Sequence, residues 1–85
     1  MDVFIYFPPD IDLEKDLIED ALDDAIGERG EVTGGGIGDK GMNIDLDVED
    51  DVAPDEILEV IRAALAELHA PYTKIVVAGK TFTAP

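Results

Sequence analysis

Apolar and polar residues alternate without a break in Met42-Asn43-Ile44-Asp45-Leu46-Asp47-Val48-Glu49. Successive side chains of a β-strand point to opposite faces of the sheet, so this pattern predicts a strand with one buried and one solvated face. The solvated face carries the polar set, which is Asn43, Asp45, Asp47 and Glu49. A strand of this kind belongs in a sheet that other elements cover on one side only.

The segment before this strand predicts a strand and a helix. Val3–Phe7 is β-branched and aromatic and stops at Pro8-Pro9, which is typical of a central strand. Apolar residues then recur at helical spacing from Leu13 to Ile26. The expected limits of this helix are Asp10 or Asp12 as the N-cap and Gly27 or Gly30 at the end.

The remaining segments predict a second helix and further strands. Glu31–Thr33 is long enough only for a short strand, and Gly34–Gly41 is expected to form a glycine-rich loop. Pro54 suits the first position of a helix. Lys74–Ala78 predicts a fourth strand, and Thr81–Thr83 leaves open a short fifth one.

The order of these elements, βαββαβ, predicts a single α+β domain over residues 1–85. The expected fold is a ferredoxin-like two-layer sandwich, with an antiparallel four-stranded sheet and both helices on one face. Strands one and three, Val3–Phe7 and Met42–Glu49, would be central. Each βαβ half would have a right-handed crossover.

The uncovered face of such a sheet is the candidate site. If Val3, Ile5 and Phe7 face the helices, Phe4 and Tyr6 face outward, beside the polar set of the alternating strand. The opposite phase stays open, because every residue from Val3 to Phe7 is apolar or aromatic. Outward rings could also do no more than shield the strands.

The charge of the chain points to a basic partner. The 85 residues include 21 acidic and 6 basic ones, a net charge of −15, and every acidic residue precedes Leu68. Dense carboxylates attract cationic proteins and repel nucleic acid and anionic membranes. An acidic proteome or a need for solubility would produce the same composition.

The chain offers few residues for catalysis or metal binding. It has no Cys and no Ser, and His69 is its only histidine, so neither an ordinary zinc site nor a common nucleophile is available. Gly36–Gly41 fits G-x-G-x-x-G, but a dinucleotide site needs a helix after the glycines, and the alternating strand follows instead. We therefore expect no catalytic residues, metal or cofactor. The glycine-rich loop, with Asp39, becomes a candidate tip that contacts a partner.

One stretch resembles a known class of protein. In a small acidic βαββαβ chain, Gly30–Gly38 leads into Asn43-Ile44-Asp45-Leu46. This combination resembles small bacterial immunity-type proteins. The resemblance implies a protein that binds and blocks a toxin, often a nuclease or another nucleic-acid-modifying enzyme. It implies no particular binding residues.

The leading hypothesis is a non-enzymatic acidic protein that neutralises a basic protein partner by occlusion. The residues expected to contact the partner are Phe4, Tyr6, Asp39, Asn43, Asp45 and Asp47. The alternative is a small-molecule-binding or regulatory ferredoxin-like domain that acts as a homodimer. No basic region opens the chain and no apolar run is long enough to span a membrane, so we expect a cytoplasmic protein.

Overall fold

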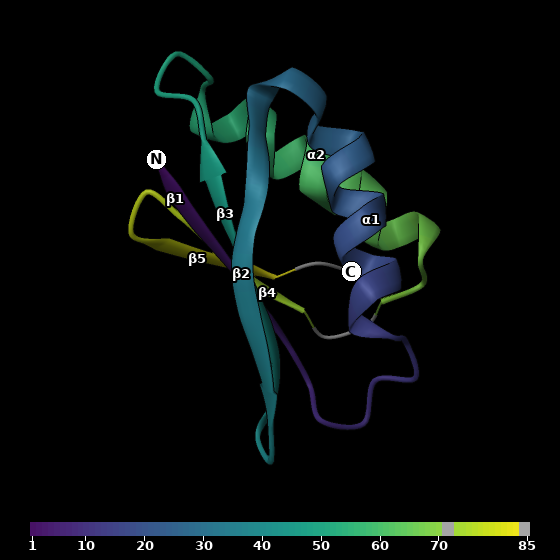
Figure 1. The fold of residues 1–85 in the computed structure, drawn as a ribbon. Helices are drawn as coiled ribbons and strands as arrows, with labels where there is room; N and C mark the ends of the chain where they lie inside the picture. Colours follow the sequence, from purple (N-terminus) through teal and green to yellow (C-terminus); the bar gives the residue numbers. More distant parts are fainter. Residues whose placement is uncertain (71–72, 84–85) are drawn as a thin grey trace.

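The computed structural model describes residues 1–70 and 73–83 as seven regular elements and one short turn of 3-10 helix. In chain order these are β1 (Asp2–Phe7), α1 (Lys15–Ile26), the 3-10 turn η1 (Gly27–Arg29), β2 (Gly30–Gly38), β3 (Gly41–Val48), α2 (Pro54–Glu67), β4 (Lys74–Val77) and β5 (Lys80–Thr83). Figure 1 shows both helices on one side of the sheet, where they contact each other. The fold is therefore α+β in two layers, as the sequence predicts.

The sheet is antiparallel throughout and has five strands in the order β2-β3-β1-β4-β5. It is broadly compatible with the expected ferredoxin-like arrangement, and β1 and β3 are interior strands. Its strand count and order differ from the four-stranded sheet expected. The reason is that Lys80–Thr83 pairs along its whole length with β4 and adds an edge strand. No helix in the described part of the chain is long and apolar enough to cross a membrane.

The prediction of a glycine-rich loop at Gly34–Gly41 was wrong. β2 runs to Gly38, and only Asp39 and Lys40 form the turn into β3. Pairing with β3 overrides the weak strand propensity of glycine. Gly35 shows why a small residue is needed, because it has a positive φ of 156° and a Cβ there would overlap the carbonyl oxygen of Asn43. The β2–β3 hairpin is therefore a continuous ribbon.

Neither of the expected N-caps begins α1. The amide of Ile11 donates to the carbonyl of Pro8 at 3.3 Å, so the chain first makes a turn after β1. Asp10 and Asp12 lie in this connection, and α1 begins at Lys15 without a side-chain cap. The end at Gly27, with a positive φ of 58°, agrees with one of the two limits expected.

The core lies between the sheet and the helices, and it fixes which way β1 faces. The alternate residues Val3, Ile5 and Phe7 are buried, whereas Phe4 is half-buried and Tyr6 is exposed. This is the first of the two phases considered for β1. The same buried cluster includes Ile44, Leu46 and Val48 in β3, Ile18, Leu22 and Ile26 in α1, and Ile57, Ile61 and Leu65 in α2.

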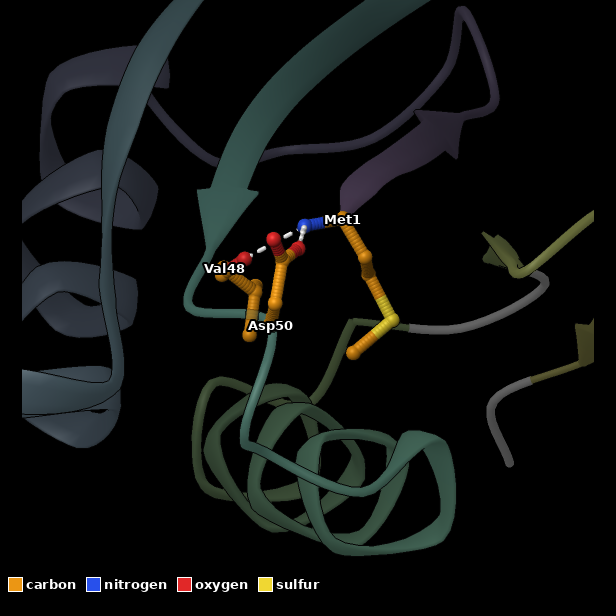
Figure 2. A network of polar contacts seen from close by, with 3 residues as sticks. All are labelled: Met1, Val48 and Asp50. Atoms are coloured by element: carbon orange, nitrogen blue, oxygen red, sulfur yellow. Dashed lines mark hydrogen bonds and ion pairs between the residues drawn. The ribbon is translucent and has the colours of Figure 1, made fainter.

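The amino group of Met1 extends the pairing of β1 with β3 by one residue (Figure 2). It donates to the carbonyl of Val48 at 2.5 Å, and the amide of Val48 donates back to the carbonyl of Met1 at 2.9 Å. It also forms an ion pair with Asp50 at 3.1 Å. The hydrogen bond that this amine donates to the carboxylate of Asp50 is the main cause that raises its pKa above the usual 8.0.

This contact predicts a loss of stability at alkaline pH. Because the folded pKa is raised, the stabilisation is complete below pH 8.0 and disappears as pH rises through the folded pKa. We expect the urea midpoint to fall between about pH 7 and about pH 9.5, below the range where lysine and tyrosine titrate. The fall should be smaller in Asp50→Asn. Asp51→Asn is the control, and an equal fall in all three proteins would contradict the assignment.

The turn of the hairpin predicts a contrast between two glycines. Gly41 has a positive φ of 126°, and a Cβ there would overlap the carbonyl oxygen of Phe7. Gly41→Ala should therefore lower the free energy of unfolding by about 2 kcal/mol or more. At Gly38 no atom lies within 4 Å of the Cβ position, so Gly38→Ala should change it by less than about 0.5 kcal/mol. Urea denaturation of both variants tests this, and equal costs would contradict it.

Candidate functional site

The face of the sheet away from the helices brings four of the six predicted contact residues together. Phe4 lies directly opposite Asp45, and Tyr6 lies directly opposite Asn43. Met1 and Val48 exchange both backbone hydrogen bonds, and hydrogen-bonded and non-hydrogen-bonded pairs alternate along an antiparallel ladder. Counted from that pair, Phe4–Asp45 and Tyr6–Asn43 are both non-hydrogen-bonded pairs. Side chains approach most closely in such pairs, so each ring of β1 has a polar neighbour from β3.

The neighbours on the other side of the rings come from β4. Val76 lies opposite Phe4, and Lys74 lies opposite Tyr6. Phe4 is thus set between a carboxylate and an apolar side chain, and it is half-buried. Tyr6 is 45% exposed and sits between the amide of Asn43, a member of the expected polar set, and the cation of Lys74. The register between β1 and β4 places Lys74 beside Tyr6, and the local sequence pattern does not predict that register.

Asp47 lies further along the same face, in a row of acidic residues. Its cross-strand partners are Asp2 on β1 and Glu31 on β2. Asp2 and Glu31 do not stand out in the sequence, because only the register shows that they share a row with Asp47. No group of acidic or histidine side chains in the described residues could hold a metal ion.

Two hydrogen bonds position Asp45. The side-chain amide of Asn43 donates to its carboxylate at 3.1 Å, along the solvated face of β3. The hydroxyl of Thr33 donates to its main-chain carbonyl at 3.3 Å, at the point where β2 shifts register between Val32 and Gly34. Asn43 therefore orients the carboxylate that lies beside Phe4.

Asp39 is separate from this group. It lies in the two-residue turn of the β2–β3 hairpin, which projects at one end of the molecule (Figure 1). Lys40, Gly41 and Met42 separate Asp39 from Asn43 along the chain. The structure therefore places Asp39 at a tip, as expected, although the tip belongs to a strand hairpin and not to a long loop.

The acidic residues of the protein are mostly not neutralised. Among the described residues only three of the 21 carboxylates form ion pairs, and these are Glu19 with Lys15, Glu56 with Arg29, and Asp50 with the amine of Met1. No charged residue is buried in the part of the chain that the structure describes. The net charge of −15 is therefore displayed on the surface and remains available to attract cations.

Comparison of the chain with protein families, with curated proteins and with solved structures gives no match.

The two sides of β1 predict opposite responses to truncation. Ile5 is fully buried against the helices, so Ile5→Ala should lower the free energy of unfolding by about 3 kcal/mol. Tyr6 points to solvent, and Tyr6→Ala should cost about 1 kcal/mol, mainly through lost cross-strand packing. Urea denaturation measures both values. A larger cost for Tyr6→Ala would mean that this ring is structural and unavailable as a contact.

Proposed function

We propose that this protein is a non-enzymatic acidic binding protein that neutralises a basic protein partner by covering its anion-binding surface. The observation that carries the proposal is the pairing of Phe4 with Asp45, which puts a half-buried ring directly beside an oriented carboxylate on an uncovered sheet face. Occlusion needs no reaction, so the scarcity of nucleophiles in the chain does not count against it.

The two rings would supply most of the binding energy. Aromatic residues near the centre of an interface are common hot spots, because they bury a large area at a low cost in conformational entropy. Phe4 and Tyr6 lie on the interior strand β1, so they are near the middle of the face. A partner that covers them would displace water from both rings.

The carboxylates would set the orientation of the partner and the rate of association. Electrostatic steering raises association rates to about 10⁸–10⁹ M⁻¹s⁻¹ at low salt. Asp45 and Asp47 would meet cationic side chains of the partner, with Asp39 as an outlying contact at the hairpin tip. A partner that normally binds nucleic-acid phosphate has the matching positive surface.

We also propose the finer assignments that the sequence analysis expected. The fold is a ferredoxin-like domain that β5 extends by one strand. The partner class is a bacterial toxin that acts on nucleic acid, and the protein works in the cytoplasm. The support for the toxin is the resemblance of Gly30–Gly38 and the following strand to immunity-type proteins, together with the charge.

Two matched double variants test the proposal on the basic proteins that the immobilised chain captures from a lysate of its own organism. Asp45→Asn/Asp47→Asn removes two charges from the site, and Asp20→Asn/Asp24→Asn removes two exposed charges from α1. We expect the first pair to weaken the purified complex at least about tenfold, which is about 1.4 kcal/mol. The second pair should weaken it much less.

The association rate provides a second reading of the same complexes. It should fall steeply between about 0.01 M and about 0.15 M salt, where the Debye length falls from about 30 Å to about 8 Å. Equal losses in the two double variants would show that the charge acts without a defined site. A rate that does not change with salt would remove steering from the mechanism.

A further inference from the structure

One edge of the sheet has a run of backbone with no partner. Hydrogen-bonded pairs recur at every second position of the β1–β3 ladder, counted from the Met1–Val48 pair. Met42 and Ile44 belong to such pairs, so their N–H and C=O groups point toward β1. Their neighbours on β2, Ile37 and Gly35, therefore turn their own N–H and C=O groups outward. Among the described residues, nothing bonds to these outward groups.

Some of the other outward groups on the two edges are bonded. At the other end of β2, the carboxylate of Asp23 in α1 accepts the outward N–H of Val32 at 3.1 Å. At the opposite edge of the sheet, Arg62 of α2 donates to the carbonyl of Thr83 at 3.1 Å, and β5 has only four residues. Proteins usually protect exposed edges with charges, prolines or covering elements. Gly34–Gly38 contains no charged residue and no proline of its own, and the side chain of Lys15 in α1 lies beside it only at Gly35.

A groove opens beside this free run. It lies between the β1–α1 connection and the end of the hairpin, and it has a volume of about 430 Å³. Its apolar lining includes Ile11, Leu13 and Ile37, of which Ile37 is 75% exposed. Its acidic lining is Glu14 and Asp16. The one cation in the lining, Lys15, forms an ion pair with Glu19 at 3.1 Å, so the two carboxylates are not neutralised.

We propose that Gly34–Gly38 binds an extended basic segment of the partner protein as a sixth strand. Backbone hydrogen bonds to Gly35 and Ile37 would hold the segment, and its alternate side chains would enter the groove beside Ile37. Such strand addition derives affinity from the main chain and specificity from side-chain pockets. This inference rests on the proposed function, because it takes the partner to be a basic protein.

Charge and composition favour a basic segment over a second copy of this chain. Two copies would each bring a net charge of −15 to the contact. Pairing of two β2 edges would also bury little apolar area, because four of the five residues in Gly34–Gly38 are glycines. A cationic strand instead places positive charge beside Glu14 and Asp16.

The added strand would also be continuous with the candidate site. Gly34, Gly36 and Gly38 lie on the same face as Asp45, Asn43 and Gly41, because they are their cross-strand partners. These glycines put no side chain between the edge of the sheet and the residues of β3. One partner could therefore pair with β2 and cover the rings of β1.

The test uses the full chain and the fluorescent heptapeptide KVKTKVK as a probe. We expect binding that protects the amides of Gly35 and Ile37 from hydrogen exchange by at least about tenfold. A second peptide has the same sequence but is N-methylated at its three central residues, which keeps the charge and removes backbone donors. This peptide should bind at least about tenfold more weakly.

Three protein variants locate the contact. Ile37→Pro removes an outward N–H without breaking the β2–β3 ladder and should weaken binding at least about tenfold. Ile37→Ala keeps the N–H and should weaken it less. Thr81→Pro is the matched control, because Thr81 lies opposite Val76 and turns its N–H out of the β5 edge; it should leave binding unchanged.

The possible results separate this inference from the proposed function. Equal binding of the two peptides, or no binding of KVKTKVK, would overturn strand addition. Neither result would change the response of the captured partner to Asp45→Asn/Asp47→Asn, which tests the proposed function. A dimer in sedimentation that Ile37→Pro abolishes, with no peptide bound, would assign the edge to a second copy and overturn the proposal. Because the N-methylated peptide needs no variant, the test stands even if Ile37→Pro does not fold.

Discussion

The antiparallel pairing of β1 with β3 positions the rest of the molecule. These two strands are interior to the sheet, and their buried sides form the surface on which both helices pack. The same pairing puts Phe4 beside Asp45 on the other side. A shift of one residue in β3 would turn its apolar set to solvent, so the core holds the register that assembles the candidate site. Stability and the proposed function therefore depend on one alignment.

The sequence predicted the face of β3 but not all of what surrounds it. The alternation from Met42 to Glu49 predicts a single buried face, because only one of its faces is apolar. Val3–Phe7 is apolar on both sides, so either face could be buried, and only packing against the helices selects one. The positions of Lys74 and Asp2 on the open face depend on long-range register, which no local pattern encodes.

The glycines of β2 show where propensity misleads. Glycine is depleted in strands because it lacks a side chain to pack and loses much entropy on folding. Here the tertiary pairing with β3 outweighs that preference, and close backbone contact at Gly35 makes a larger residue unfavourable. The same lack of side chains leaves the edge bare. Sequence reasoning located the unusual segment correctly and assigned it the wrong structure, because a loop and a bare edge strand have the same composition.

The arrangement of charge favours a binding role over solubility alone. Because no charged side chain is buried in residues 1–70 and 73–83, the carboxylates repel one another through solvent, where salt screens them. Glu31, Asp47 and Asp2 nevertheless lie directly opposite one another across three strands. Like charges in this position are destabilising, by amounts comparable to the 0.2–1 kcal/mol or so of a favourable cross-strand pair. The amine of Met1 relieves only part of this repulsion. Solubility requires charge but not its concentration in one row, whereas a cationic partner would turn that repulsion into attraction.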